Sequence, residues 1–294
     1  MSIVTFWNDD REQSGRTLTS VAVATSMAIQ HNFKILLLST SYKDPTMKNC
    51  FWVDVNRKNL RGIVGKNGNI AVENGIEGLS KIIVSNKIQP NIITDYTRVI
   101  FKDRLEVLSG YIGDLEKTDE ENIQDYKKTA ECYAELIRTA NQYYDMVLVD
   151  LDKCLDRHIK DEILKISNLN VLVITQRLAS LNRYNNLKET NKDIIGPRTM
   201  VAIGKYSDKT KYNRKNITRY LGEKKELNII PFNTLYFEAA EEASVADLFL
   251  RLRKIKDTTD KNYIFVNEVS NLTNNIIVRL QELQKRMRWE NVNI

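Results

Sequence analysis

Residues 1–40 decide the fold, and they read MSIVTFWNDDREQSGRTLTSVAVATSMAIQHNFKILLLST. The apolar stretch Ile3–Trp7 predicts a buried strand, and Asn8–Ser14 predicts a polar loop. A helix opens at Gly15-Arg16-Thr17, and its apolar residues recur at three- and four-residue spacing, which places them on one face. Lys34–Leu38 predicts a second strand, of the kind that a parallel sheet buries on both faces. We therefore expect a βαβ unit whose first loop lies at the mouth of a parallel sheet, where a helix start favours an anion.

This loop partly matches a known phosphate-binding spacing, G-x-x-x-x-G-K-[ST]. The corresponding residues 10–17 read DREQSGRT, so the second glycine and the hydroxyl are present, while Asp10 replaces the first glycine and an arginine replaces the lysine. The match is weak as an isolated motif. Its position, directly after a strand and at the start of a helix, strengthens the match, and an ordinary βα turn with a polar helix start is the equal alternative.

Length and composition indicate one large α/β domain. We expect a single domain over 1–294 that ends in a helix at about 268–289. No apolar run approaches the ~20 residues that span a bilayer, and no signal-peptide pattern opens the chain, so we expect a cytoplasmic protein. The three cysteines are far apart and there are only two histidines, which argues against a zinc site and a disulfide framework.

The positive charge is concentrated in one stretch. Residues 205–225 hold eight Lys or Arg against two acids, an excess equal to the whole net charge of +6. Such a stretch is commonly a solvated helix face, but it also suits nucleic acid, an anionic lipid or an acidic partner. The residues that would form this basic patch are Lys209, Lys211, Arg214, Lys215 and Arg219.

Strands and helices alternate through the rest of the chain. Strands are expected at 104–108, 144–152, 171–175, 199–203 and 229–233, and helices at 75–86, 120–143, 181–192, 212–221 and 238–256. This alternation predicts a three-layer, doubly wound, mostly parallel sheet. The 10–17 loop, Asp150 and the turns at 204–206 and 231–233 should then meet at the carboxyl ends of the strands. An aspartate there is where P-loop enzymes hold magnesium, although Asp150 could also be a strand-end cap.

The order and spacing of these elements resemble the MinD/ParA superfamily of deviant P-loop ATPases over nearly the whole chain. The family's loop, K-G-G-x-G-K-T, falls on residues 11–17 without a gap. The resemblance implies ATP or ADP with magnesium at Thr17 and Asp150, and a homodimer in which Arg11 reaches the partner's nucleotide. The implied nucleotide-binding residues are Arg11, Glu12, Gln13, Ser14, Gly15, Arg16, Thr17, Leu18, Lys205, Pro231, Phe232 and Asn233.

The departures from the family pattern concern hydrolysis. The family's second strand ends in D-x-D, and these places are Ser39 and Ser41 here, which cannot carry a negative charge. Two loop glycines are replaced by Glu12 and Gln13. Arginine at position 16 keeps the charge, but its planar fork does not fit the cradle of a lysine.

This degenerate pattern is most similar to the TadZ/CpaE-like localisation factors of pilus and secretion systems. It implies a localisation or assembly factor that binds nucleotide weakly or has lost binding, and that is at best a slow ATPase. Its partners would be pilus, secretion or mobile-element proteins, which would bring it to a membrane or a cell pole.

Three alternatives stay open. An active ATPase could use its arginines as charges, with Asp44 or Asp152 as the acid. A scaffold without a nucleotide role could bind nucleic acid through residues 205–225, where tyrosines interleave with the basic side chains. The C-terminal helix could contact a membrane through its apolar stripe, or pack on the sheet with it. That stripe comprises Leu272, Ile276, Leu280, Leu283 and Met287.

Overall fold

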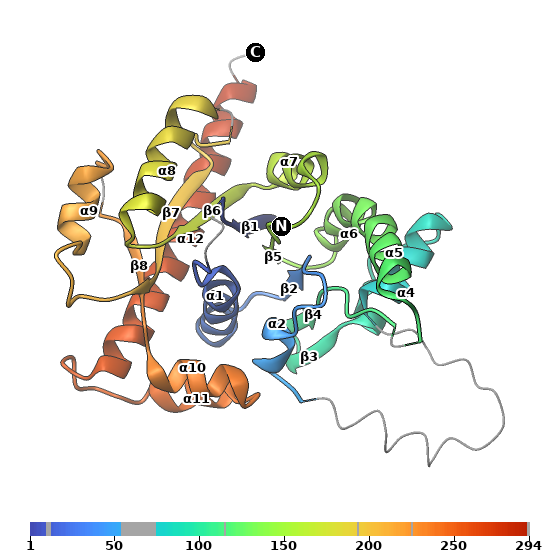
Figure 1. Cartoon of the computed structure of the whole chain (residues 1–294), viewed down its shortest axis with the longest axis horizontal. Coiled ribbons are helices and arrows are strands. Elements are labelled where there is room, and N and C mark those ends of the chain that lie inside the picture. The colour runs from blue at the N-terminus through green and yellow to red at the C-terminus, as the bar shows by residue number, and fades with distance from the viewer. Residues whose placement is uncertain (10–12, 54–74, 115, 193, 225, 293–294) are drawn as a thin grey trace.

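The chain folds around one eight-stranded sheet, in the order β3-β4-β2-β5-β1-β6-β7-β8 (Figure 1). This computed structural model describes residues 1–9, 13–53, 75–114, 116–192, 194–224 and 226–292. Every neighbouring pair of strands is parallel except β3 with β4, so the predicted doubly wound, mostly parallel sheet is confirmed. The strands are β1 (Ser2–Trp7), β2 (Ile35–Ser39), β3 (Arg98–Phe101), β4 (Leu105–Leu108), β5 (Met146–Asp150), β6 (Leu169–Ile174), β7 (Thr199–Tyr206) and β8 (Asn228–Pro231).

Helices cover both faces of the sheet and form two separate hydrophobic cores. Leu36 and Leu38 of β2 point into one core, while Ile35 and Leu37 point into the other, which explains the unbroken apolar run in this strand. One core contains α1 (Arg16–Gln30), α2 (Thr46–Asn49), α10 (Thr234–Glu241), α11 (Val245–Leu252) and α12 (Lys261–Val292). The other contains α4 (Ile76–Val84), the short helix η1 (Ile92–Tyr96), α5 (Asp119–Glu131), α6 (Tyr133–Ala140), α7 (Arg157–Ile166), α8 (Leu178–Thr190) and α9 (Arg214–Tyr220).

Several predicted elements differ from the structure. The helix expected over 120–143 is two helices, α5 and α6, that meet at Cys132. The helix expected over 238–256 is also two, because Ala243 takes a left-handed φ of 56° between α10 and α11. The helix α7 and the edge strand β3 were not predicted. Half of β3 is exposed, so it lacks the apolar run that marks the central strands.

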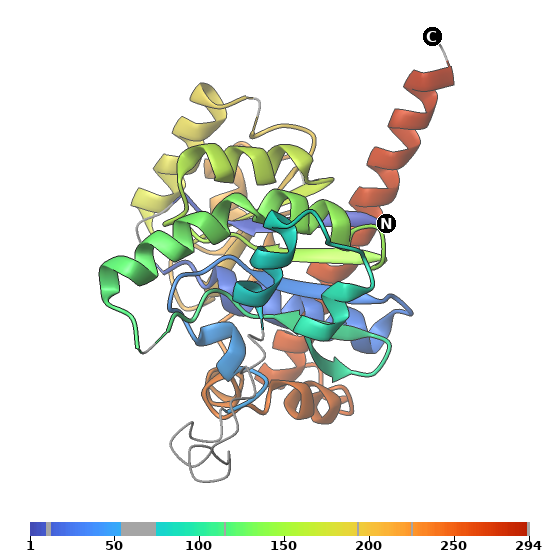
Figure 2. The ribbon, with the colours of Figure 1, turned by 90° about the vertical axis from the view of Figure 1, so that its right-hand side faces the viewer.

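The C-terminal helix α12 begins at Lys261, earlier than the sequence predicts. Its stripe is buried as far as Leu283, with Leu272 and Ile276 fully covered, so this part of the stripe packs into the core. The end of α12 stands clear of the rest of the molecule (Figure 2). Met287 lies beyond the residues whose side chains the structure describes. None of the described helices is long and apolar enough to cross a membrane.

Candidate functional site

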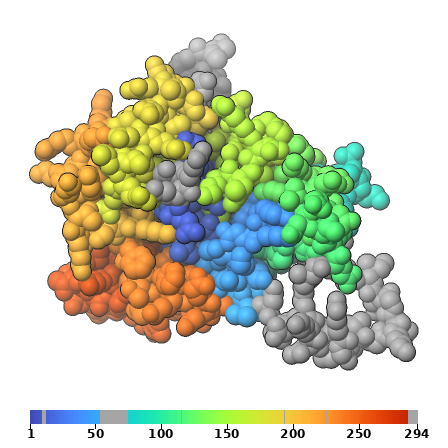
Figure 3. All heavy atoms as spheres, in the orientation of Figure 1, coloured from blue at the N-terminus to red at the C-terminus, as the bar shows by residue number. Residues whose placement is uncertain are grey.

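A cavity of about 500 Å³ lies at the carboxyl ends of the central strands. Segments far apart in the sequence surround it, and Figure 3 shows the N-terminal segment in blue between light-blue and orange segments. Arg11 and Glu12 lie outside the described residues. The other ten residues that the resemblance assigns to nucleotide all line this cavity: Gln13, Ser14, Gly15, Arg16, Thr17, Leu18, Lys205, Pro231, Phe232 and Asn233.

Two glycines allow the loop after β1 to pack closely against the end of β7. Gly15 takes a left-handed φ of 80°, which permits the turn into α1. A Cβ on Gly204 would collide with the carbonyl oxygen of Ser14, so only glycine allows this close approach. Lys205 follows with a left-handed φ of 52°, and its side chain lies over Gly15. A residue with a side chain at position 204 would therefore push the loop away from β7.

The first turn of α1 offers hydrogen-bond donors to the cavity. The N–H groups of Arg16, Thr17 and Leu18 have no acceptor within the helix, because they precede its first intrahelical bond, from Thr19 to the Gly15 carbonyl. The hydroxyl of Ser14 is buried and has no hydrogen-bond partner among the described residues. Together with the helix dipole, these donors make the start of α1 suited to an anion.

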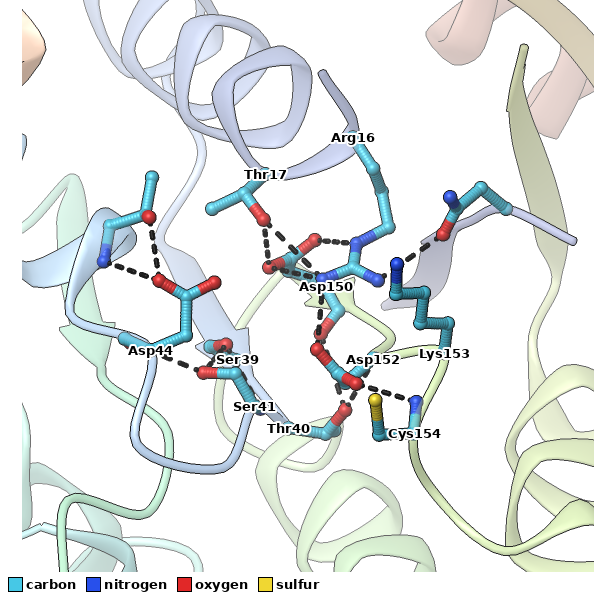
Figure 4. Close-up of polar contacts among 12 residues, drawn as sticks. Arg16, Thr17, Ser39, Thr40, Ser41, Asp44, Asp150, Asp152, Lys153 and Cys154 are labelled. Atoms are coloured by element: carbon cyan, nitrogen blue, oxygen red, sulfur yellow. Dashed lines mark hydrogen bonds and ion pairs between the residues drawn. The ribbon is translucent and has the colours of Figure 1, made fainter. Parts of the chain in front are cut away.

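Arg16 does not extend freely into the cavity but forms a buried ion pair with Asp150 (Figure 4). Its Nε lies 2.5 Å from Asp150 Oδ1, and its Nη2 lies 3.3 Å from Oδ2. Nη2 also lies 3.5 Å from Asp152, and Nη1 lies 3.4 Å from Asn8. Burial alone would lower the pKa of Arg16, but the two carboxylates outweigh burial and raise the pKa above its ordinary value. The guanidinium therefore stays charged.

Thr17 and Asp150, the predicted metal ligands, do lie together. The Thr17 hydroxyl donates to Asp150 Oδ2 at 2.9 Å, so both oxygens of this buried carboxylate are engaged by α1. Asp152 accepts from the Cys154 N–H at 2.6 Å as well as from Arg16. Among the residues described, no group of three or more His, Cys, Asp or Glu could hold a metal ion.

The two positions that hold the D-x-D acids in the family pattern are buried and tightly packed here. Ser39 and Ser41 are buried, and their hydroxyls lie 3.0 Å apart in a hydrogen bond. Gly110 packs so tightly over Ser41 that a Cβ on it would collide with the Ser41 hydroxyl. Asp44, a candidate substitute acid, lines the cavity, and one of its oxygens accepts from the backbone N–H and the hydroxyl of Thr46.

The opposite wall of the cavity is apolar and partly aromatic. Pro231 ends β8, and the Phe232 side chain is 60% exposed beside it. Asn233 is buried instead, where its oxygen caps α10 through the Tyr236 N–H and its amide donates to Asn262. Phe232 is therefore free to contact a flat ring, whereas the side chain of Asn233 supports the wall.

Ten further described residues line the cavity. Asp44 and Asp152 were named from the sequence as candidate acids, and the other eight were not assigned: Asn8, Thr19, Thr46, Lys153, Ile230, Tyr236, Phe237 and Glu241. The hydroxyl of Tyr236 donates to the Leu18 carbonyl at 2.6 Å and so ties α10 to α1. The sequence signal that could have identified Asn8 as a cavity residue is its position at the end of an expected strand. No pattern marks the residues of α10, because the cavity uses only one side of that helix.

The basic patch lies away from this cavity on α9 and the loop before it. Lys209, Lys211, Lys215 and Arg219 are exposed. Arg214 is not part of that exposed surface, because its Nε donates to the Leu227 carbonyl at 2.6 Å and its Nη1 lies 3.4 Å from Glu268. Four of the five predicted patch residues are thus available to a partner.

Comparisons by sequence give no match to a protein-family model or to a curated protein. Solved structures do match. A ParA family ATPase from Chlorobium tepidum is 14% identical with a TM-score of 0.65, covering 92% of this chain and 98% of that one. The Pyrococcus horikoshii MinD complexed with Mg-ADP is 12% identical with a TM-score of 0.59, covering 92% and 94%.

A putative plasmid partition protein from Borrelia burgdorferi, bound to AMPPNP, is 14% identical with a TM-score of 0.55, covering 97% of this chain and 99% of that one. These likenesses extend over nearly the whole chain and agree with its parallel sheet and the position of its first loop. The chain therefore has the fold of the MinD and ParA P-loop ATPases.

Proposed function

We propose that this protein binds ATP or ADP in the cavity and acts as a localisation or assembly factor, with little or no hydrolysis. The observation that carries the proposal is the convergence of ten predicted residues, from three separate parts of the chain, on one cavity. The phosphates would lie at the start of α1 and the base near Phe232. The MinD and plasmid partition structures with this fold hold Mg-ADP and AMPPNP, respectively.

The state of the acids supports slow or absent hydrolysis. Phosphoryl transfer to water needs a group that orients the water and a metal that neutralises the developing charge. Ser39 and Ser41 are neutral and hydrogen-bonded to each other, and Asp150 is paired with Arg16. Nucleotide would then serve as a ligand that sets the state of the protein. A homodimer formed on this face would cover the exposed Phe232 and Phe237.

Thermal unfolding with millimolar ATP or ADP tests the binding. A ligand at about 100 times its dissociation constant adds about 2.7 kcal/mol to the folded state, which raises Tm by several degrees. We expect this shift in the wild type, a smaller one in Lys205→Ala, and an unchanged one in Lys209→Ala, an exposed lysine outside the cavity. No shift in the wild type would refute binding, and magnesium-dependent turnover that Thr17→Val abolishes would refute the loss of hydrolysis.

A second function, nucleic-acid binding, is favoured by the exposure of the basic patch. Lys211 and Lys215 lie in one short segment with two further cations, and charged groups of this kind give binding that weakens steeply with salt. We expect reversal of both charges to abolish DNA binding in a fluorescence anisotropy titration. Reversal of Lys254 and Lys256, two exposed lysines on another surface loop, is the control. Equal loss of DNA binding in both variants would show only a general effect of charge, and would reject the basic patch as the binding site.

A further inference from the structure

The fold family implies a magnesium ion beside the phosphates, but the residues of this chain do not suit one. We propose that the protein binds its nucleotide without a divalent cation, with the Arg16 guanidinium taking the place of the metal's charge. This inference rests on the proposed nucleotide-binding function and concerns the same cavity. The observations that support this inference are the hydrogen bonds of Asp150, Asp152 and Thr17.

The Arg16 guanidinium lies beside the hydroxyl on which a metal would bind. Nη2 of Arg16 is 3.4 Å from Thr17 Oγ1. A magnesium ion at its usual distance of about 2.1 Å from that oxygen would lie within about 5.5 Å of this nitrogen. Repulsion between the two cations is strong at such a range in a buried site, where water screens it little.

The nearby carboxylates already engage this guanidinium. Asp150 forms a close pair with Arg16, and Asp152 contacts the same guanidinium. Ser39 and Ser41 replace the two further acids of the family pattern and bind each other. Because the Thr17 hydroxyl also donates to Asp150, both oxygens of that carboxylate are occupied by contacts within the protein.

Arginine has the chemistry to replace the ion for binding. Its guanidinium is planar, permanently charged and carries five N–H donors, which match phosphate oxygens in pairs. Arg16 lines the cavity, next to the free N–H groups of α1, and the exposed Lys205 adds a second positive charge. To hold a diphosphate, the guanidinium would exchange some of its contacts with Asp150, Asp152 and Asn8 for phosphate oxygens.

Isothermal titration of the full chain with ADP and with ATP, in EDTA and in millimolar Mg²⁺, tests the inference. We expect the dissociation constants in the two buffers to agree within about twofold. Binding that is about tenfold or more tighter in Mg²⁺ would overturn the inference and leave the proposed function intact. No binding in either buffer would refute the proposed function and this inference with it.

Two matched variants test the role assigned to Arg16. Arg16→Lys keeps the charge but removes the planar fork that contacts both Asp150 and Thr17, so we expect it to acquire a magnesium dependence of about tenfold. Arg138→Lys, at an exposed arginine of α6 outside the cavity, should behave like the wild type. A folded Arg16→Lys protein that ignores Mg²⁺ would contradict the role of Arg16. If this variant does not fold, the wild-type comparison in the two buffers still decides.

Discussion

At the scale of single residues, the defining feature is the ion pair between Arg16 and Asp150. The sequence shows an arginine at the place of a phosphate-binding lysine and an acid at the end of a strand. It does not show that they contact each other, because 134 residues separate them and the contact depends on the order of β1 and β5 in the sheet. The tight packing of Gly110 against Ser41 could not be predicted either, because it also depends on how distant segments of the chain pack.

Breaking this pair should be costly. Asp150→Ala leaves a buried guanidinium with a weaker partner, and we expect the free energy of unfolding to fall by about 3–5 kcal/mol. Replacing both residues, as Arg16→Met with Asp150→Leu, should restore much of the loss, since only Asp152, whose side chain is partly exposed, then loses a cation. Urea unfolding measures both effects.

The exposed pair of Arg138 and Glu162, whose atoms lie 2.8 Å apart, provides the control. Exposed pairs contribute little, so Arg138→Ala should cost less than about 1 kcal/mol. If Asp150→Ala cost no more than Arg138→Ala, the Arg16–Asp150 pair would not be the buried structural contact described here.

At the scale of elements, the sequence predicts the central strands and α1 well. These strands are mostly apolar because both of their faces are buried, and that pattern is specific. Helix boundaries were harder to predict. The break between α10 and α11 depends on Ala243, which takes a left-handed φ. An alanine in the sequence gives no indication of that conformation. The edge strand β3 is half exposed and carries no clear alternation.

The stripe of α12 should behave as core. Ile276 is fully buried against the sheet, so Ile276→Ala should lower the free energy of unfolding by about 2–5 kcal/mol. Val278, on the same helix, is half exposed, and Val278→Ala should change the free energy of unfolding by less than about 0.5 kcal/mol. Chemical denaturation of the two variants gives the comparison. Equal, small effects would mean that the stripe is not packed in solution and would favour the membrane alternative.

At the scale of the whole molecule, the sheet order creates the candidate site. The strand β1 lies between β5 and β6, and β7 and β8 follow, so the loop at 13–15, Asp150 and the turn at 231–233 reach one edge. Parallel strands bring their carboxyl ends together, which is why ten of the twenty described residues that line the cavity could be assigned before the structure. The contribution of α10, through Tyr236 and Glu241, could not be predicted, because it depends on how the helix packs against α1.

The central claim is that nucleotide binds in this cavity, and amide hydrogen exchange with and without ATP tests it most directly. We predict slower exchange in peptides covering residues 13–19 and 230–237, because a bound phosphate chain engages the N–H groups of α1 and a base covers the turn after β8. Peptides covering residues 209–219 should exchange at an unchanged rate. Unchanged exchange at 13–19, or protection confined to 209–219, would contradict the claim.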